Sequence, residues 1–546
     1  MKHYHISLTV LLLYVTASFG QIGKEHFSYL DVFALEYAVD PQISPDGTSI
    51  VYRRTGFDTM KDRATGKLWM LTTDGKQHVK LTSREVTESS PRWSPDGDRL
   101  AFISSTDEGA EIYMYWVTSG KIARISQLAQ SPSSLSWSPD GKWLAFSMNV
   151  PEAPPVIAKM PKSPKGAKWA AKPRITDRLK HEADGRGYIA PGFQQLFVIP
   201  ATGGTPRQLT SGKSNHSGQL SWSPDGNALY FSSNRNEDWE YDFVNSEIYK
   251  VTVATGNIDV LTNRKGPDYA PVASPDGNYV AYISFEDKVQ AYQVRELYIM
   301  NTDGSGKRSL TSALDRSVSE IQWDAKSKKL YFTYTDKGNT KIATVDLNGN
   351  IKKLADDLGG TSIGRPYPGG SYSVSENGSI AYTHSRPDYP ADVALLKPRA
   401  RTPQLLTRLN NDLLSYRNLG SVEEVWYTSS VDGRALQGWL VKPPNHESDK
   451  TYPLLVEIHG GPILNYGDRF SAEMQLYAAA GYVVFYPNPR GSTGYGEEFG
   501  NLLYNNYPGD DYNDIMDGVD YLISKGITSE DQLYVTGGSA GGIMTA

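Results

Sequence analysis

The amino-acid sequence predicts an all-β propeller of seven blades, followed by an α/β domain. Three observations lead to this prediction. A Ser-Pro-Asp-Gly turn with an apolar strand after it recurs along most of the chain, and a glycine hairpin follows each copy. Beyond position 407 the repeats stop, and continuous apolar runs alternate with a helical pattern. Repeats at this spacing are typical of propeller blades, and strand-helix-strand order is typical of an α/β sheet.

The propeller is predicted over residues 37–407, after a short N-terminal segment at 21–36. In each turn Pro fixes φ and Gly tolerates a positive φ, and the strand that follows alternates apolar and polar residues. Seven copies occur, the last two weaker: "ISPDGTSIVY" from Ile43, "WSPDGDRLAF" from Trp93, "WSPDGKWLAF" from Trp137, "WSPDGNALYF" from Trp222, "ASPDGNYVAY" from Ala273, "WDAKSKKLYF" from Trp323 and "VSENGSIAY" from Val374.

A second hairpin completes each blade. It consists of a strand, a glycine turn and a strand, as in "LFVIPATGGTPRQLT", and most copies end in Leu-Thr. Two hairpins supply four strands to a blade. One interval, between Ser147 and Leu196, breaks the spacing with a stretch rich in Pro, Lys and Arg. We expect a surface loop with some helix there, or a lid or pocket wall, because long loops in compact folds are often functional.

The α/β domain is predicted over residues 408–546. "SVEEVWYTSS" and "ALQGWLVKPP" alternate as strands, while "YPLLVEIHGGP" and "AAGYVVFYPNPRG" are the continuous apolar runs of buried parallel strands. "GDDYNDIMDGVDYLISKG" carries apolar residues at helical spacing. "QLYVTGG" reads as a further buried strand, and it leads into a glycine-rich segment around Ser539.

Ser539 lies where a hydrolase places its nucleophile. Gly537 and Gly541 flank it at −2 and +2, a strand precedes it, and a helix can follow it. This is the context of a nucleophile elbow, in which Cβ atoms at the two glycine positions would collide and the turn lifts the hydroxyl clear of the sheet. The helix N-terminus offers backbone N–H groups to a developing oxyanion. We therefore assign Ser539 as nucleophile and the N–H of Ala540 as one oxyanion donor.

A second glycine turn, His459-Gly460-Gly461-Pro462, ends an upstream strand. Such a turn supplies the other oxyanion donor in α/β-hydrolases, and we assign it to the backbone N–H of Gly461. We read His459 as a structural or substrate-facing residue of this turn and not as the catalytic base. Each glycine run alone is also compatible with an ordinary turn. Together they predict an α/β-hydrolase domain with a catalytic serine.

On these residues the chain resembles the prolyl oligopeptidase family of serine peptidases. "HGGP", "NPRGSTGYG" and "GGSAGG" resemble its acylaminoacyl peptidase and dipeptidyl peptidase branch, and the resemblance extends over nearly the whole mature chain. The Ser-Pro-Asp-Gly repeats alone also resemble the propeller of the TolB translocation protein. The family implies peptide substrates, cleaved through an acyl-enzyme by an acylaminoacyl, dipeptidyl or oligopeptidase activity. A homo-oligomer of this chain is also compatible with the resemblance.

The family's Ser-Asp-His triad implies an Asp and a His after the Ser. Here the sequence ends seven residues beyond Ser539, no acidic residue follows it, and all nine histidines precede it. We therefore expect this chain to be a C-terminally truncated piece of a longer protein, with an incomplete α/β-hydrolase domain. Alone it is expected to keep a folded propeller, to be inactive, and to leave the strand before Ser539 with an exposed edge.

The acidic stretch "NEDWEYDF" supplies Glu237, Asp238, Glu240 and Asp242 to a loop of the fourth blade. Some family members bind the free N-terminus of a peptide through propeller carboxylates. This resemblance implies a substrate-binding role for Glu237, Asp238 and Glu240, with a solvated acidic loop as the alternative. The rival to an enzyme is an exported propeller binding protein whose hydrolase part is vestigial. A downstream Asp and His at hydrolase spacing would decide for the enzyme.

Composition narrows the partners and the N-terminus indicates the compartment. A net charge of −6 argues against nucleic acid. The absence of cysteine excludes disulfides and thiolate sites, and no motif indicates a metal or a cofactor. A basic start, the apolar run "ISLTVLLLYVTA" and small residues before Gln21 form a secretory signal peptide at 1–20, with an uncleaved anchor as the alternative. We expect a periplasmic or extracellular protein without a membrane span after cleavage.

Overall fold

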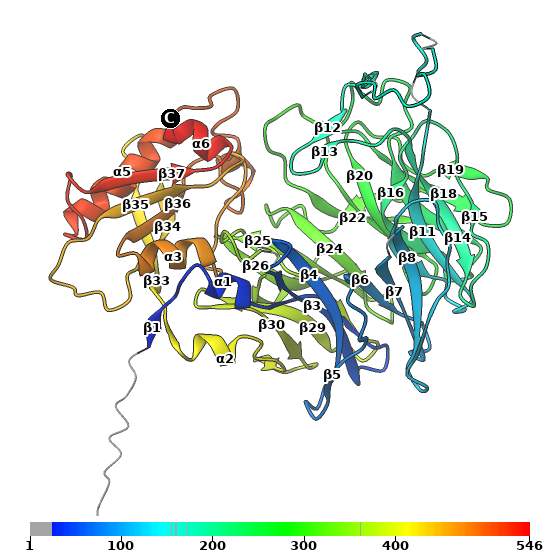
Figure 1. Cartoon of the computed structure of the whole chain (residues 1–546), viewed down its shortest axis with the longest axis horizontal. Coiled ribbons are helices and arrows are strands. Elements are labelled where there is room, and N and C mark those ends of the chain that lie inside the picture. Colours follow the sequence, from blue (N-terminus) through cyan, green and yellow to red (C-terminus); the bar gives the residue numbers. More distant parts are fainter. Residues whose placement is uncertain (1–23, 107, 154, 159–160, 172, 361) are drawn as a thin grey trace, which may run out of the picture.

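The computed structural model describes residues 24–546, apart from 107, 154, 159–160, 172 and 361. The predicted signal peptide at 1–20 lies outside the described residues. The described chain forms a propeller of antiparallel sheets and, beside it, a mixed sheet with helices on both faces (Figure 1). None of its helices is long and apolar enough to cross a membrane.

The repeat region forms five four-stranded antiparallel sheets and one eight-stranded sheet among the described residues. Within the larger sheet, β24–β27 and β28–β31 are joined through the single pair Leu358 and His384. The strands are β2 Tyr37–Ile43, β3 Ser49–Asp58, β4 Arg63–Thr72 and β5 His78–Lys80; β6 Glu88–Trp93, β7 Arg99–Thr106, β8 Gly109–Trp116 and β9 Lys121–Arg124; β10 Pro132–Trp137, β11 Trp143–Val150, β14 Phe193–Pro200 and β15 Arg207–Gln208; β16 Ser217–Trp222, β17 Ala228–Ser233, β18 Glu247–Thr252 and β19 Ile258–Val260; β20 Asp268–Ala273, β21 Tyr279–Ser284, β22 Glu296–Asn301 and β23 Arg308–Ser309; β24 Val318–Trp323, β25 Lys329–Asp336, β26 Asn339–Asp346 and β27 Ile351–Leu358; β28 Tyr372–Val374, β29 Ile380–Arg386, β30 Tyr389–Leu396 and β31 Gln404–Leu405.

The Ser-Pro-Asp-Gly motif joins the first two strands of a sheet and also ties neighbouring sheets together. Its Ser hydroxyl donates to the Asp carboxylate, at 2.6 Å between Ser94 and Asp96. The Trp before the motif reaches the preceding sheet, where the Trp137 indole N–H donates to the Arg92 carbonyl at 2.9 Å. The motif therefore fixes the turn and the packing between blades at once. The same indole bond is made by Trp93, Trp222 and Trp323.

The Leu-Thr that ends most hairpins closes the outer edge of a blade. The Thr210 hydroxyl accepts the backbone N–H of Leu196 at 2.9 Å and donates to Gln195 at 2.8 Å. This bond fastens the end of the fourth strand to the start of the third. The hydroxyls of Ser126, Thr262, Thr311 and Thr407 accept the equivalent third-strand N–H in their own sheets.

The ring closes where the first sheet meets the last. The backbone N–H of Ile43 on β2 donates to the Ser373 hydroxyl on β28 at 2.8 Å. Asp40 makes the same kind of bond to Ser371 at 3.0 Å. Apolar side chains of both sheets share one core, which includes Ala38, Ile50, Tyr52, Ala381, Val393 and Leu395.

The interval that breaks the repeat lies between β11 and β14. Its described residues form an exposed loop with one two-stranded sheet, β12 Glu182–Ala183 and β13 Gly187–Tyr188. The expectation of some helix in this interval is wrong for the described part, which contains none. Its abundant prolines and lysines favour an open chain, and Arg178 donates to the carbonyl of Gly192, the last residue before β14, at 3.0 Å.

The α/β domain is a five-stranded sheet in the order β33-β34-β36-β35-β37. β33 and β34 are antiparallel, and β35 pairs in parallel with both β36 and β37, as the continuous apolar runs predict. The strands are β33 Ser421–Thr428, β34 Ala435–Lys442, β35 Leu454–Ile458, β36 Val483–Asn488 and β37 Leu533–Gly537, and the helices are α3 Ala472–Ala479, α4 Glu497–Gly500, α5 Asp511–Ser524 and α6 Ala540–Thr545.

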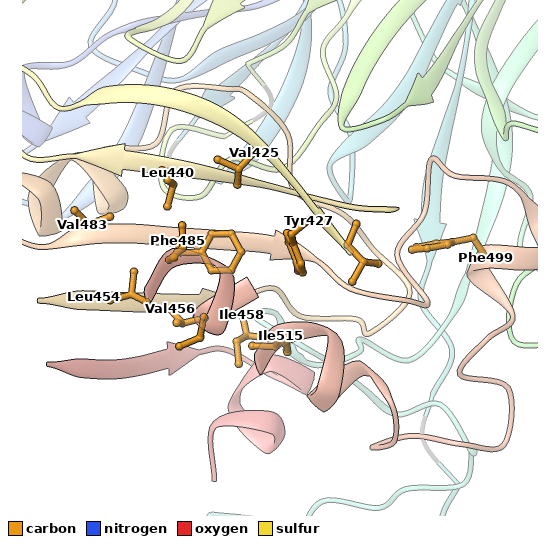
Figure 2. Close-up of a cluster of buried hydrophobic side chains, with 13 residues drawn as sticks. Val425, Tyr427, Leu440, Leu454, Val456, Ile458, Val483, Phe485, Phe499 and Ile515 are labelled. Atoms are coloured by element: carbon orange, nitrogen blue, oxygen red, sulfur yellow. The ribbon is translucent and has the colours of Figure 1, made fainter. Parts of the chain in front are cut away.

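Helices cover both faces of this sheet. Alternate residues of β34 and β36 point to opposite faces, so Trp439 and Tyr486 pack towards α3 while Leu440 and Phe485 pack towards α5. Figure 2 shows the cluster on the α5 side, in which Ile515 of α5 lies next to Ile458 of β35. The predicted helix is therefore confirmed, with its apolar face in the core.

β37 does not fit the prediction of a buried strand. It lies at the edge of the sheet, and Leu533, Tyr534 and Val535 are 37%, 50% and 47% exposed. These side chains are exposed because β37 has a neighbouring strand on only one side among the described residues. The expectation of an exposed edge at this strand agrees with the structure.

Loops between the second and third strands of the blades face the α/β domain. The N–H of Lys337, between β25 and β26, donates to the Gly494 carbonyl at 3.0 Å. The N–H of Tyr292 donates to the Asn501 side chain at 3.0 Å. The N-terminal residues join this interface through Asp31, which pairs with Arg417 at 2.8 Å. The elements here are β1 Glu25–His26, α1 Asp31–Ala34, α2 Asn411–Leu414 and β32 Arg417–Asn418, with β1 and β32 paired in parallel.

Candidate active site

Ser539 occupies the turn between β37 and α6. Its backbone has φ 57° and ψ −120°, in the left-handed region that non-glycine residues rarely adopt, and its side chain is exposed. Strain of this kind is concentrated at functional sites. The turn therefore has the backbone conformation that presents a hydroxyl away from the sheet.

The flanking glycines are required by the packing of the turn. A Cβ at Gly537 would lie 2.5 Å from the carbonyl oxygen of Gly541, and a Cβ at Gly541 would overlap the carbonyl oxygen of Ile458. Neither atom can move without breaking the strand or the helix. The sequence argument for small residues at −2 and +2 thus has a direct steric basis.

The His459–Pro462 turn lies beside the elbow because of strand register. Ile458, the last residue of β35, pairs with Gly537 of β37. A Cβ at Gly460 would stand 3.4 Å from the Ser539 Cβ. The N–H groups of Gly461 and Ala540 have no intramolecular acceptor among the described residues. Both follow the ends of the parallel neighbours β35 and β37.

His459 is held inside its turn. It is buried, its Nδ1–H donates to the Gly460 carbonyl at 2.8 Å, and its Nε2 lies 3.0 Å from the Ser492 hydroxyl. Burial lowers the pKa of His459 to about 4, so the ring is neutral at physiological pH. One ring nitrogen is thus bonded within the turn and the other to the loop that follows β36. No side chain of the described chain hydrogen-bonds the Ser539 hydroxyl.

Sequence reasoning missed three side chains near the elbow. Arg365 and Tyr367 come from the propeller, between β27 and β28, and Glu457 is fully buried on β35. Burial raises the pKa of Glu457 to about 7, and Arg365 opposes the rise. The available signal was "GRPYPGG", a Gly- and Pro-rich stretch at the junction of the last two repeats.

The predicted acidic residues lie in a different place. Glu237 and Asp238 are exposed in the loop between β17 and β18, and the carboxylate of Glu240 accepts the N–H of Leu179 at 3.2 Å. The loop is thus tied to the insertion before β14. No hydrogen bond or ion pair of the described residues joins it to the elbow. It does lie on a loop between second and third strands, the end of the propeller that faces the α/β domain.

A cavity lies between the propeller and the α/β domain next to the site. Its volume is about 550 Å³. Tyr367 of the propeller lines it, together with Asn465 and Thr493 of the α/β domain. Glu320 of β24 lines this cavity and also the axial channel of the propeller, so the two spaces lie side by side. Within the described ranges, no group of three or more His, Asp or Glu side chains is arranged to hold a metal ion.

Three family models match parts of this chain. The Prolyl oligopeptidase family model matches residues 468–546, the TolB beta propeller domain matches 32–164, and the Dipeptidyl peptidase IV N-terminal region matches 167–290. The resemblance of the repeats to TolB is thereby confirmed. The two propeller models match the N-terminal part of the chain and the peptidase model matches its C-terminal part, which is the domain order that the sequence predicts.

Similar proteins extend over nearly the whole chain. The uncharacterized peptidase YuxL of Bacillus subtilis (strain 168) is 30% identical over 532 residues, which cover 94% of this chain and 78% of that protein. Dipeptidyl-peptidase 5 of Porphyromonas gingivalis is 25% identical over 548 residues, covering 97% and 77%. The acylaminoacyl peptidase of Pyrococcus horikoshii has the same fold, with a TM-score of 0.77 at 20% identity, covering 95% of this chain and 76% of that one.

Proposed function

Because the chain belongs to the prolyl oligopeptidase family, we propose that it is a serine peptidase that cleaves short peptides through an acyl-enzyme at Ser539. The observation that carries the proposal is the elbow. An exposed serine hydroxyl stands on a strained turn, beside a second glycine turn, with two backbone N–H groups unoccupied. Peptidases among the similar proteins support the same reaction class.

The proposed reaction uses these groups in sequence. Ser539 Oγ attacks the peptide carbonyl carbon, its proton passes to a general base, and the carbonyl oxygen becomes an oxyanion that accepts the N–H groups of Ala540 and Gly461. Collapse breaks the C–N bond, and the amine leaves with a proton. Water then attacks the ester, which releases the acid and restores the serine hydroxyl. Loss of one oxyanion donor costs about 100- to 1000-fold in rate.

Short peptides are the proposed substrates because of the space next to the site. The cavity between the propeller and the α/β domain has a volume of about 550 Å³, which accommodates a few residues and not a folded chain. A dipeptidyl peptidase among the relatives favours recognition of a free N-terminus. Glu237 and Asp238 remain candidates for that role, since both carboxylates are exposed on the end of the propeller that faces the α/β domain.

Two further proposals concern the whole chain. We count the eight-stranded sheet as two blades, which makes a seven-bladed propeller. We also propose export through the N-terminal signal at 1–20. Mass spectrometry of the exported protein is expected to find an N-terminus near Gln21, and an intact Met1 in the cytoplasmic fraction would contradict export.

The nucleophile is tested on the protein expressed from its complete gene. A fluorophosphonate probe is expected to label Ser539, and Ser539→Ala is expected to abolish labelling. Gly541→Ala should also abolish it, because a Cβ there overlaps the Ile458 carbonyl oxygen. Gly542→Ala is the matched control, since its Cβ would stand 3.5 Å from the nearest atom outside its neighbours. Labelling at another residue, with Ser539→Ala unaffected, would overturn the assignment.

Chromogenic substrates separate the three peptidase activities. A dipeptidyl amide, an acylated aminoacyl amide and an internally quenched hexapeptide are compared on one preparation. We expect turnover of at least one, abolished in Ser539→Ala. No turnover and no labelling, with peptides still bound, would favour the exported binding protein with a vestigial hydrolase part.

A further inference from the structure

A short propeller segment, residues 363–367, enters the α/β domain. It lies between β27 and β28, and its backbone carbonyls accept hydrogen bonds from the start of α3. The N–H of Ala472 donates to Ile363 at 2.7 Å, and the hydroxyl of Ser471, the N-cap residue, donates to Gly364 at 2.6 Å. A helix N-terminus has free N–H groups that need acceptors. Here the propeller supplies them, so the segment and α3 are held in one position.

Arg365 extends from this segment between two carboxylates of the α/β domain. Its Nε donates to Glu473 of α3 at 3.0 Å, and its Nη2 lies 3.4 Å from Glu457 of β35. Glu457 is fully buried, and its oxygens have no hydrogen-bond partner among the described residues. A buried carboxylate requires a compensating charge. Arg365 is the cation that reaches it.

The same guanidinium touches the elbow. A Cβ at Gly538 would lie 2.7 Å from Arg365 Nη1, so the guanidinium lies close beside the residue that precedes Ser539. Arg365 therefore contacts the residue before the nucleophile and also β35, the strand that leads into the His459–Pro462 turn. Other ion pairs between the two domains, such as Lys288 with Glu497, lie on a different loop.

Tyr367 fixes the glycine turn directly. Its hydroxyl accepts the backbone N–H of Gly460 at 3.2 Å, and its ring packs on Tyr466 with the centroids 4.8 Å apart. With the Gly460 N–H occupied, the next one along the turn, that of Gly461, is left free. The Tyr367 hydroxyl thus holds the Gly460 peptide, next to the unoccupied N–H group of Gly461.

We propose that Arg365 and Tyr367 are positioning residues of the peptidase site, through which the propeller holds the elbow and the His459–Pro462 turn in their relative places. The inference rests on the proposed function, because the groups they position are the nucleophile and the oxyanion donors. Misplacement of such groups by an ångström lowers the rate by up to about 100-fold without removing any reacting atom. The propeller is then part of the catalytic geometry as well as a wall of the cavity.

The test compares Tyr367→Phe with Tyr477→Phe in the protein expressed from its complete gene. Both changes remove one hydroxyl from the same neighbourhood, but Tyr477 donates only to Glu473, at 3.0 Å, and does not touch the turn. We expect Tyr367→Phe to lower kcat about tenfold, because the loss of this hydrogen bond lets the glycine turn leave its place. KM should stay within about twofold, and the Tyr477→Phe variant should keep the wild-type kcat.

Arg365 is tested by graded replacement. Arg365→Gln is expected to lower kcat by about 10- to 100-fold, and Arg365→Lys, which keeps the charge near Glu457, is expected to restore part of it. Thermal unfolding of each variant serves as the folding control. If an Arg365 variant does not fold, Tyr367→Phe, which keeps the aromatic ring, still tests the positioning role.

The outcomes separate this inference from the proposed function. If the wild-type protein neither turns over peptides nor reacts with the probe at Ser539, the proposed function fails. If the wild-type protein is active and folded Tyr367→Phe has the same kcat as Tyr477→Phe, the positioning role is wrong and the peptidase stands. A rise in KM alone would also overturn the positioning role, because it would place Tyr367 in substrate binding.

Discussion

Glu457 brings an ionisable group into the core of the α/β domain. It is fully buried, and burial raises its pKa to about 7 from an ordinary value of 4.5. The groups that face it are Arg365, which favours the ionised form, Glu473, which disfavours it, and the Tyr466 hydroxyl. Between these two pH values the folded protein binds a proton at this site that the unfolded chain has released.

We expect Glu457→Gln to stabilise the protein more at pH 8 than at pH 5. The wild-type protein loses stability as the pH rises from 4.5 to about 7, because the native state then binds more protons than the unfolded state. A shift of this size corresponds to roughly 3 kcal/mol. Urea denaturation of both proteins at both pH values measures the difference. An equal effect at pH 5 and pH 8 would contradict it.

At the scale of single residues, sequence reasoning found what local sterics determine. Gly537 and Gly541 could be assigned because an elbow around Ser539 excludes a Cβ at both positions, and the structure has that steric conflict. Arg365 and Tyr367 could not be found in this way. They stand about 170 residues before the serine they surround, and their roles depend on how two domains meet.

The elements of the propeller are stabilised by hydroxyls that recur with the repeat. Thr210 is buried, and its hydroxyl accepts the Leu196 N–H of β14 and donates to Gln195. Valine has the same shape as threonine but no hydroxyl, so it would leave a buried N–H without an acceptor. The Leu-Thr motif therefore contributes hydrogen bonding as well as apolar packing.

We expect Thr210→Val to destabilise the propeller by about 1–3 kcal/mol, the cost of an unsatisfied buried donor. Thr205→Val is the matched control, because Thr205 is exposed in the same hairpin and makes no such bond. Chemical denaturation followed by tryptophan fluorescence gives both values. Equal stabilities of the two variants would show that the hydroxyl is dispensable.

Elements whose partners lie close in sequence were predicted best. The Ser-Pro-Asp-Gly turns and α5 depend on neighbouring residues, and they form where the pattern places them. The apolar run at Leu533 predicts a buried strand, but the exposure of β37 is decided by which strands lie beside it. The insertion before β14 lacks any periodic pattern, so its helix content could not be deduced.

At the scale of the whole molecule, the propeller sheets are packed between neighbours, while one edge of the α/β sheet is exposed. Each propeller sheet contacts two others around the ring, whereas within the described part of the chain β37 pairs only with β35 and exposes three apolar side chains. An edge of this kind has unpaired backbone groups and invites association. The propeller and the β37 edge of the α/β domain are thus expected to differ in local stability.

We expect hydrogen exchange of residues 24–546 to show this difference. Backbone amides of the propeller strands and of β35 should be protected, while those of β37 and α6 exchange much faster. Mass spectrometry of peptic peptides resolves the two classes. Protection of β37 equal to that of β35 would contradict the expectation, and concentration-dependent protection would indicate association through this edge.

Segment 363–367 of the propeller is bonded to the α/β domain, and this contact restricts how the two domains can evolve. A recombination event that replaced the propeller by another would take Arg365 and Tyr367 with it and leave Glu457 buried without its cation. The two halves therefore cannot be exchanged like independent modules. A substitution at position 365 becomes tolerable only with matching changes at 457 and 473, so these three positions are expected to be inherited as a set.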